Sequence, residues 1–134
     1  MPLIPLTRTA HENKGWARYS SYEFATRQTI AALVAAEMPR AVVHLPVGFA
    51  RIQDRFQPVA ILSLEENRNL FVNKDGKWIG GYIPAVFRAY PFALVNAEKE
   101  EKVLCFDDSS GLLVDSAEGE PFFDSEGNPS AATR

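Results

Sequence analysis

The sequence is poor in the side chains that most often carry metal or covalent chemistry. It contains one cysteine and two histidines in 134 residues, and the histidines, His11 and His44, stand far apart. A protein metal site needs several His, Cys, Asp or Glu ligands at close spacing, so we predict no metal and no cofactor. The single cysteine, Cys105, also excludes a disulfide within the chain.

Cys105 and His44 would act as a nucleophile and a base only if the fold brought them together. Cys105 stands between Leu104 and Phe106 in an apolar run, where cysteine usually behaves as a small buried hydrophobe. We therefore predict a buried, unreactive Cys105 and a partly buried His44, with no catalytic residue among them.

Long apolar segments and a strong charge of one sign are missing as well. No stretch approaches the roughly 20 apolar residues of a membrane span, which predicts no span. The first eight residues lack the apolar segment of a signal peptide. This predicts a cytoplasmic protein and leaves association with a surface through a partner open. The formal net charge of −3 argues against a general nucleic-acid binder, which usually has a basic surface.

What the chain does contain is a segment that recurs. Residues 38–50 align without a gap on residues 83–95, and the prolines recur at matched positions: Pro39 with Pro84, and Pro46 with Pro91. A proline is well tolerated in the first turn of a helix and pushes the residue before it toward extended geometry. Each block from proline to proline therefore predicts a helix of about two turns.

Apolar runs follow each predicted helix in the same order. They lie at 47–52, 59–62 and 70–73 in the first copy and at 92–95, 103–106 and 112–115 in the second. We therefore predict a unit of one helix and three strands, used twice. Neither copy could cover its own apolar face, so the two units should share one core.

Two further local predictions come from propensity and turn chemistry. Residues 28–37 are rich in helix formers, and Ile30, Leu33 and Val34 fall on one helical face, which predicts a helix there. Asp75-Gly76 supplies the turn residues of a tight hairpin, so residues 70–72 should pair with Trp78 and Ile79.

The predicted fold is α+β, with a mainly antiparallel sheet that could close into a barrel, and with short helices. The length fits a single domain, residues 1–134. We divide it into an N-terminal arm, a core that holds the two repeat units, and an acidic, loosely ordered tail: 1–21, 22–115 (units 38–73 and 83–115) and 116–134.

Five side chains are candidates for a ligand site: Trp78, Tyr82, Arg88, Tyr90 and Glu37. Tryptophan and tyrosine combine apolar area with hydrogen-bonding capacity, so they could line a groove for a sugar or a peptide beside an arginine. The alternative is that Trp78 and Tyr82 cover a sheet edge, and that Glu37 pairs with Arg88 as a structural tie. In the tail, the isolated aromatic pair Phe122-Phe123 is the candidate partner-binding site.

Adjacent carboxylates occur at Glu65-Glu66 and at Asp107-Asp108. Such pairs could hold a cation or act as acid and base. Neighbouring residues on a loop seldom converge on one point, however, so we expect solvated loops.

Three segments resemble the SapC family of S-layer-related bacterial proteins: 70–78 (LFVNKDGKW), 82–85 (YIPA) and 88–92 (RAYPF). The resemblance extends over most of the chain, from Tyr22 to Pro129, and its motifs are structural in character. It implies no particular reaction, because the family has no established activity. Similar proteins are often encoded near outer-membrane receptors for nutrient uptake, which implies a role in that system. The family pattern is also extended rather than helical around residues 31–38.

These observations favour a non-catalytic binding or assembly module of the SapC type, acting through a protein partner or as a homo-oligomer. The alternative is an enzyme or a small-ligand binder for a nutrient derived from a carbohydrate or an amino acid. A module should expose an apolar surface, whereas a ligand binder should hold convergent polar groups in a pocket.

Overall fold

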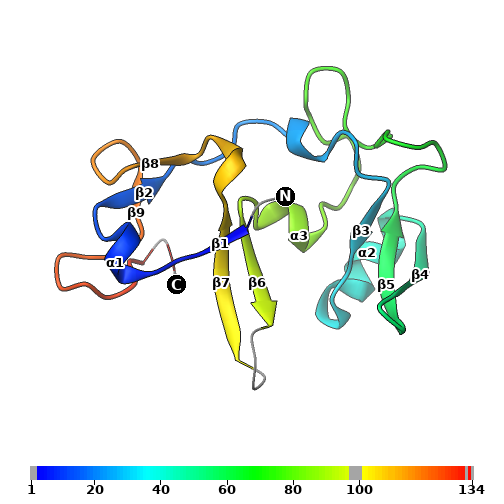
Figure 1. Ribbon diagram of the computed structural model, residues 1–134. Helices are drawn as coiled ribbons and strands as arrows, with labels where there is room; N and C mark the ends of the chain where they lie inside the picture. The colour runs from blue at the N-terminus through cyan, green and yellow to red at the C-terminus, as the bar shows by residue number, and fades with distance from the viewer. Residues whose placement is uncertain (1–2, 97–100, 132, 134) are drawn as a thin grey trace. The chain divides into compact units, whose positions relative to one another are not determined.

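A computed structural model describes residues 3–96, 101–131 and 133 of the protein (Figure 1). The chain divides into two compact units. One is contiguous, Ser20–Ala89, and is called here the central unit; the other joins both ends of the chain, Met1–Tyr19 and Tyr90–Arg134, and is called the terminal unit.

The central unit is built on one three-stranded antiparallel sheet of order β3-β5-β4. Its elements, labelled in Figure 1 where space allows, are η1 (Glu23–Ala25), β3 (Ile30–Ala32), η2 (Ala35–Glu37), α2 (Met38–His44), β4 (Val47–Ile52), β5 (Arg55–Ile61) and α3 (Ala85–Arg88).

The terminal unit holds two small antiparallel sheets, of order β1-β7-β6 and β8-β2-β9. Its elements are β1 (Leu3–Pro5), α1 (Arg8–His11), β2 (Lys14–Trp16), β6 (Phe92–Asn96), β7 (Lys102–Asp107), η4 (Asp108–Ser110), β8 (Leu113–Asp115) and β9 (Glu120–Pro121).

The α+β class with mostly antiparallel pairing is therefore confirmed, but the barrel is not formed. Within the described residues the chain makes three small sheets, and none of them closes on itself. A barrel forms when one sheet has enough strands to curl until its first and last strands pair. Each of these sheets has three short strands, so its two edges stay open.

The first block between prolines forms the helix predicted for it, the seven residues of α2, whereas the second forms only the four residues of α3 and not the two turns predicted. In α2, Pro39 occupies the first turn, and Leu45 leaves the helix with extended geometry just before Pro46. Ala41 and Leu45 from this segment are buried in the core of the central unit. α3 is shorter and begins directly after Pro84.

The helix predicted for residues 28–37 is wrong. Residues 30–32 form β3, with Ala31 opposite Ala60 of β5, and a single 3-10 turn follows. Side chains alternate here, with Ala31 and Leu33 buried and Ile30 exposed, which is the period of a strand. Helix propensities differ by less than about 1 kcal/mol per residue, so pairing with β5 decides the conformation.

The predicted hairpin around Asp75-Gly76 is confirmed. Val72 and Trp78 form an antiparallel bridge, and the N–H of Ile79 donates to the carbonyl of Phe71 over 2.8 Å. Gly76 has a φ of +75°, which favours glycine. Oδ1 of Asn73 accepts from the N–H groups of residues two and four positions ahead, which fixes the turn.

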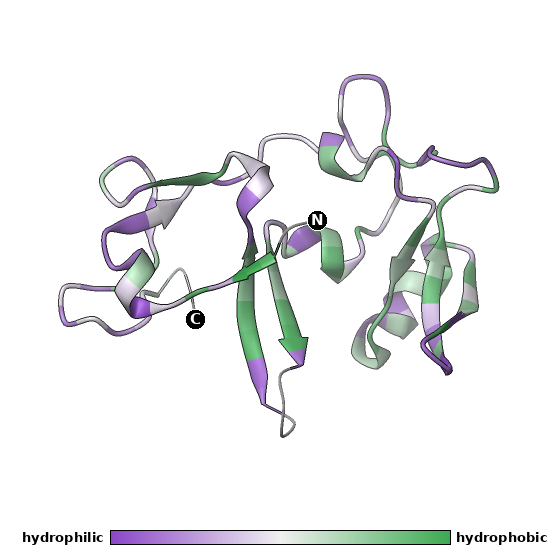
Figure 2. Cartoon of the chain, viewed as in Figure 1, coloured by the Kyte–Doolittle hydropathy of each residue, from purple (hydrophilic) through white to green (hydrophobic). Residues whose placement is uncertain are grey.

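The core of the terminal unit is aromatic. Trp16, Phe106 and Phe122 are its buried residues. Edge-to-face contacts link Phe92 to Trp16 at 4.9 Å and to Phe106 at 5.2 Å between ring centroids. Figure 2 shows the corresponding apolar character along most of β6 and β7. Cys105 lies buried in β7, as predicted.

Among the residues that the structure describes, no helix combines the length with the apolar character that crossing a bilayer requires.

Candidate functional site

Four of the five candidate ligand-binding residues come together in the central unit. The hydroxyl of Tyr82 donates to Oε1 of Glu37 over 2.9 Å and accepts from Nη2 of Arg88 over 3.1 Å. The indole N–H of Trp78 donates to the carbonyl of Tyr82 over 3.0 Å. Tyr82 therefore joins Glu37 to Arg88 through its hydroxyl, and we call these four residues the Tyr82 network.

Glu37 directs its carboxylate at donors of the chain itself. Oε1 also accepts from the N–H of Ala85 at the start of α3, and Oε2 accepts from the N–H of Val34 before η2, over 2.9 and 2.8 Å. A helix start leaves N–H groups without intrahelical partners, and an acceptor there stabilises it. Glu37 is buried, and its carboxylate ties η2 to the first turn of α3.

Trp78 and Arg88 are likewise held by their neighbours. The Trp78 ring stacks on Phe71 at 5.6 Å with an interplanar angle of 16°. Nε of Arg88 donates to the carbonyl of Ile83, and its guanidinium lies 5.5 Å from the Tyr82 ring centroid. These contacts hold the side chains and α3 in place. The Glu37 carboxylate already accepts hydrogen bonds from three donors of the chain itself.

The fifth candidate, Tyr90, belongs to the terminal unit. Its ring meets that of Tyr19 edge to face at 6.2 Å. Burial raises the pKa of the Tyr90 hydroxyl, and the charge of Asp107 and a hydrogen bond to it raise the pKa further. Asp107 itself is buried and accepts from both the N–H and the hydroxyl of Ser109.

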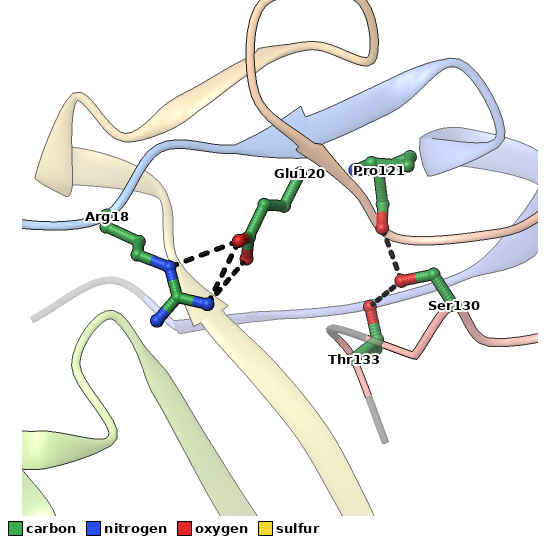
Figure 3. A network of polar contacts seen from close by, with 5 residues as sticks. All are labelled: Arg18, Glu120, Pro121, Ser130 and Thr133. Carbon is green, nitrogen blue, oxygen red and sulfur yellow. Dashed lines mark hydrogen bonds and ion pairs between the residues drawn. The ribbon is translucent and has the colours of Figure 1, made fainter.

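The predicted partner-binding pair lies in the same unit. Phe122 is fully buried in the aromatic core, and Phe123 is half-buried against it. Figure 3 shows what holds this segment: Arg18 binds Glu120 of β9 over 2.9 Å, and Ser130 donates to the carbonyl of Pro121 over 2.6 Å. Phe122 therefore contributes to the packing of the core, and of the two only Phe123 has part of its surface exposed to solvent.

The remaining chemical candidates lie apart. His44 is exposed at the end of α2, so the prediction of a partly buried histidine was wrong; Ala41 is the one described residue of α2 that is buried. Glu65 and Glu66 are exposed, and Glu65 pairs with Arg68. In the described part of the chain, no three His, Cys, Asp or Glu side chains lie close enough to hold a metal ion.

An exposed aromatic surface was missed in the sequence analysis. Phe49 on β4 and Phe56 on β5 are 70% and 72% exposed. Phe49 is opposite Pro58 and Phe56 is opposite Arg51, so both phenylalanines lie on one face of the hairpin, as diagonal neighbours. The apolar residues in 47–52 predict a strand, but the pattern does not show which of these side chains the core buries and which remain exposed.

An apolar cavity lies at the base of the same hairpin. It has a volume of about 430 Å³ and is lined by Pro46, Ile61, Leu62, Ser63, Leu64, Leu70 and Phe71. Leu64 at this cavity is 96% exposed and Leu70 is half exposed. Its residues come from three separated segments, so no local sequence pattern could predict it.

A model of the SapC family matches residues 6–134, essentially the whole chain. The chain belongs to the SapC family. No curated protein and no solved structure matches it. The segments that resemble the SapC family have clear places in the fold. Residues 70–78 form the hairpin around Asp75-Gly76, 82–85 lead into α3, and 88–92 end α3 and begin β6.

Proposed function

We propose that this SapC protein is a non-catalytic binding or assembly module that acts through a protein partner or through self-association. The observation that carries the proposal is the exposed aromatic pair Phe49 and Phe56 on the β4–β5 hairpin. Folded proteins expose many single apolar side chains, whereas adjacent exposed aromatic residues on one face are typical of interaction sites.

The hairpin reaches beyond its core, which supports an intermolecular role. Val47 and Ala60 form the pair at its base and pack in the core of the central unit. Toward the tip the same face continues through Phe49 and Phe56, which are exposed. Burying a phenylalanine side chain contributes about 1.5–3 kcal/mol, so a partner that covers both rings gains binding free energy from each.

Light scattering coupled to size exclusion tests the proposal. We expect a mass above that of one chain, either for the protein alone at high concentration or with a partner. The double variant Phe49→Ser/Phe56→Ser should lose that association. Leu94→Ser is the matched control, because Leu94 is 65% exposed on the edge strand β6 of the other unit. Association that survives the double variant, or is lost equally in the control, contradicts the proposal.

We further propose that the two units are related copies of one fold, in keeping with the repeat in the sequence. The sheets β3-β5-β4 and β1-β7-β6 have the same strand order, and each is entered from a proline-bounded segment. Matched backbone hydrogen bonds support this: Ile61 N–H to Pro46 and Asp107 N–H to Pro91, and Leu33 N–H to Pro58 and Leu6 N–H to Leu104.

The final turn of each copy supports the same proposal with a different alignment. The hairpin at 72–78 has its counterpart at 123–129, where Asp124 accepts from residues two and four ahead, as Asn73 does. Gly76 and Gly127 have similar positive φ values, +75° and +80°. On this reading residues 70–79 correspond to 121–130, rather than to 112–115 as the sequence alone predicted.

The second candidate function is a small-ligand binder or enzyme acting at the Tyr82 network. It is favoured by the convergence of Glu37, Tyr82 and Arg88, and disfavoured by the internal donors that the Glu37 carboxylate already binds. A thermal-shift screen with sugars and amino acids distinguishes it from the module. A rise in melting temperature that disappears in Tyr82→Phe would place a ligand at this network.

A further inference from the structure

We infer that β4 pairs with β4 of a second copy of this chain, antiparallel and about a two-fold axis, so that two central sheets join into one. This contact rests on the proposed function and specifies it: the partner is the same chain, and the backbone of β4 makes the contact beside Phe49 and Phe56. The residues of β4 whose backbone N–H and C=O groups point away from β5 are called here the free edge.

The hydrogen bonds to β5 show which residues form the free edge. β4 is an edge strand in the sheet order β3-β5-β4 (Figure 1). Just before β4 begins, the N–H of Ile61 donates to the carbonyl of Pro46 over 2.8 Å. Hydrogen-bonded pairs recur at every second residue of an antiparallel ladder, so the residues of β4 that direct their backbone groups toward β5 are Gly48, Ala50 and Ile52. The alternate residues therefore form the free edge: Val47, Phe49 and Arg51.

The free edge has neither partners nor protection. In the part of the chain that the structure describes, no hydrogen bond is formed by the backbone N–H or C=O of Val47, Phe49 or Arg51. β4 also lacks the features by which natural edge strands avoid pairing: its sequence, VGFARI, holds no proline or lysine, and its register with β5 runs without a bulge. Its one charged side chain, Arg51, is ion-paired with Asp54 of the same chain. The edge can therefore accept another strand.

The free edge is complementary to itself, which selects a second copy as the occupant. Antiparallel pairing about Phe49 places Phe49 opposite Phe49 of the second copy, and Val47 opposite Arg51. Each of these pairs exchanges two hydrogen bonds, so every outward N–H and C=O of the edge gains a partner. Pairing about Arg51 would instead place two arginines directly opposite each other, which is destabilising. The register about Phe49 is therefore the favoured one.

The side chains beside the free edge match in the same register. Within one chain Phe49 lies opposite Pro58 of β5, on the face that also carries Phe56. In the joined sheet the two Phe49 rings become cross-strand neighbours, so an apolar row of Pro58, Phe49, Phe49 and Pro58 runs across four strands. Aromatic cross-strand pairs stabilise a sheet. Pairing therefore covers part of a ring that is largely exposed in the single chain.

The pairing closes at the dimer. Both copies use the same residues of β4, so a two-fold dimer leaves no free edge on this strand. One strand pair is a small contact compared with the surface of about 1,200–2,000 Å² that stable complexes bury. The dimer should therefore form at high protein concentration and dissociate on dilution.

Cysteine cross-linking tests the pairing and its register on the full chain. The Cα atoms of two residues in a hydrogen-bonded pair lie about 5.5 Å apart, within the range of about 4.4–6.8 Å that a disulfide spans. With copper phenanthroline as the oxidant, Phe49→Cys should give a disulfide-linked dimer. In Arg51→Cys the two thiols are offset by about 13 Å along the strand and should remain unlinked. The natural cysteine, Cys105, is buried, and the wild type controls for its reaction.

Removal of one outward N–H tests whether the backbone makes the contact. Arg51→Pro keeps Phe49 and Phe56 but loses an N–H that donates across the dimer, and the two-fold axis doubles the loss. We expect the dissociation constant measured by sedimentation equilibrium to rise about 10-fold or more. Arg51→Ala is the matched control, because it loses the same ion pair with Asp54 and keeps the N–H. It should dimerise as the wild type does.

Leu94→Pro controls for a proline placed on an edge strand. The N–H of Asp107 donates to the carbonyl of Pro91, and β6 is the edge of its sheet, so the N–H of Leu94 points outward as that of Arg51 does. Leu94→Pro should also dimerise as the wild type does. Circular dichroism shows whether Arg51→Pro keeps its sheet, and the cysteine variants, which change only exposed side chains, test the pairing independently of it.

The outcomes separate this inference from the proposed function. Equal cross-linking of Phe49→Cys and Arg51→Cys, or wild-type species larger than a dimer, contradicts the two-fold pairing. If Phe49→Ser/Phe56→Ser abolishes association while Arg51→Pro dimerises as the wild type does, side chains alone make the contact, and the inference fails while the proposed module stands. The same holds if the wild type stays monomeric but binds another protein through Phe49 and Phe56. A wild type that neither dimerises nor binds a partner overturns both.

Discussion

The central unit and the terminal unit build sheets of the same strand order from opposite side chains. Where the middle row of the central sheet has Ala31 opposite Ala60, the corresponding row of the terminal sheet has Ile4 opposite Phe106. Ala60 and Phe106 are both fully buried. The same backbone pairing thus accommodates either the smallest or one of the largest apolar side chains in the middle of the sheet.

The difference lies in what supplies the bulk of each core. In the central unit it comes from residues outside the sheet, among them Leu33, Leu45 and Phe87. In the terminal unit it comes from the sheets themselves and from Phe122. Strand order is therefore set by backbone pairing and turns, and the core is filled by whichever layer carries large side chains.

The largest expected effect concerns the middle of the two sheets. Phe106→Ala should destabilise the terminal unit by about 3–5 kcal/mol, because it leaves a cavity in a core of edge-to-face rings. Ala60→Phe at the matched position should overpack the central unit and destabilise it by about 1–3 kcal/mol. Denaturant unfolding followed by tryptophan fluorescence measures both, since Trp16 and Trp78 report on different units.

Variants with a single tryptophan make this measurement specific. In a Trp78→Phe background the signal comes from Trp16, and in a Trp16→Phe background from Trp78; each background also provides its own reference. If Phe106→Ala shifts the unfolding midpoints reported by Trp16 and by Trp78 to the same lower denaturant concentration, the two units unfold together. Their cores would then not be separately stable, and the comparison between them would not hold.

The next largest effect concerns two buried polar side chains, each of which follows the first strand of the sheet in its unit. In the central unit Oε2 of Glu37 accepts from Val34 N–H, and in the terminal unit Nδ1 of His11 lies 3.1 Å from both the backbone nitrogen and the carbonyl oxygen of Thr7. Both side chains are buried and follow the first strand of their sheet. Glu37→Ala should lose about 3 kcal/mol, because three donors lose their acceptor, and His11→Ala about 1 kcal/mol in hydrogen bonding.

Glu37→Gln separates shape from hydrogen bonding. It keeps the length of the side chain and one acceptor oxygen, so unfolding experiments should show a smaller loss than Glu37→Ala. A double-mutant cycle with Tyr82→Phe should give a coupling above about 0.5 kcal/mol. Strict additivity of the two substitutions would mean that the Tyr82 network does not act as a unit.

Local signals in the sequence predicted the parts of this fold that neighbouring residues decide. Prolines 39 and 84 marked the helix starts, and Asp75-Gly76 marked a hairpin. The helix predicted at 28–37 failed because a partner strand far along the chain, β5, determines the conformation of residues 30–32.

The candidate site was predicted in part for the same reason. The convergence of Trp78, Tyr82, Arg88 and Glu37 follows from a short segment around Pro84, together with one distant carboxylate suggested by its place before Pro39. The burial of Phe122, the exposure of Phe49 and Phe56, and the apolar cavity depend on packing between distant segments. No residue pattern within one segment carries that information.

A smaller effect sharpens the comparison of the two final turns. Gly76→Ala and Gly127→Ala should each destabilise their unit by about 1 kcal/mol, because both positions have positive φ. Gly76→Ala should be the more harmful. A Cβ there lies 3.0 Å from Cβ of Ser21 and 3.2 Å from Cγ of Glu23, whereas at Gly127 it meets the end of the flexible Arg8 side chain. Equal losses in thermal unfolding would remove this distinction between the turns.

The smallest effect is a pH dependence confined to one unit. Tyr90 precedes Pro91 as Leu45 precedes Pro46, so an ionisable side chain replaces an apolar one at the matched position. Burial, followed by the charge of Asp107, raises the pKa of Tyr90. A group whose pKa is raised by folding contributes stability that is fully present below its unfolded pKa, near 10, and is lost as pH rises through the folded pKa. The terminal unit should therefore lose stability on moving from neutral pH to above pH 10, as followed by Trp16 fluorescence.

Two tyrosine variants test whether the Tyr90 hydroxyl causes this loss. Tyr90→Phe should reduce the loss of stability by the part that the Tyr90 hydroxyl contributes, while Tyr22→Phe in the central unit should leave the Trp16 transition unchanged. A Tyr90→Phe protein with the same alkaline slope as the wild type would show that the hydroxyl has the same proton affinity in the folded and unfolded chain.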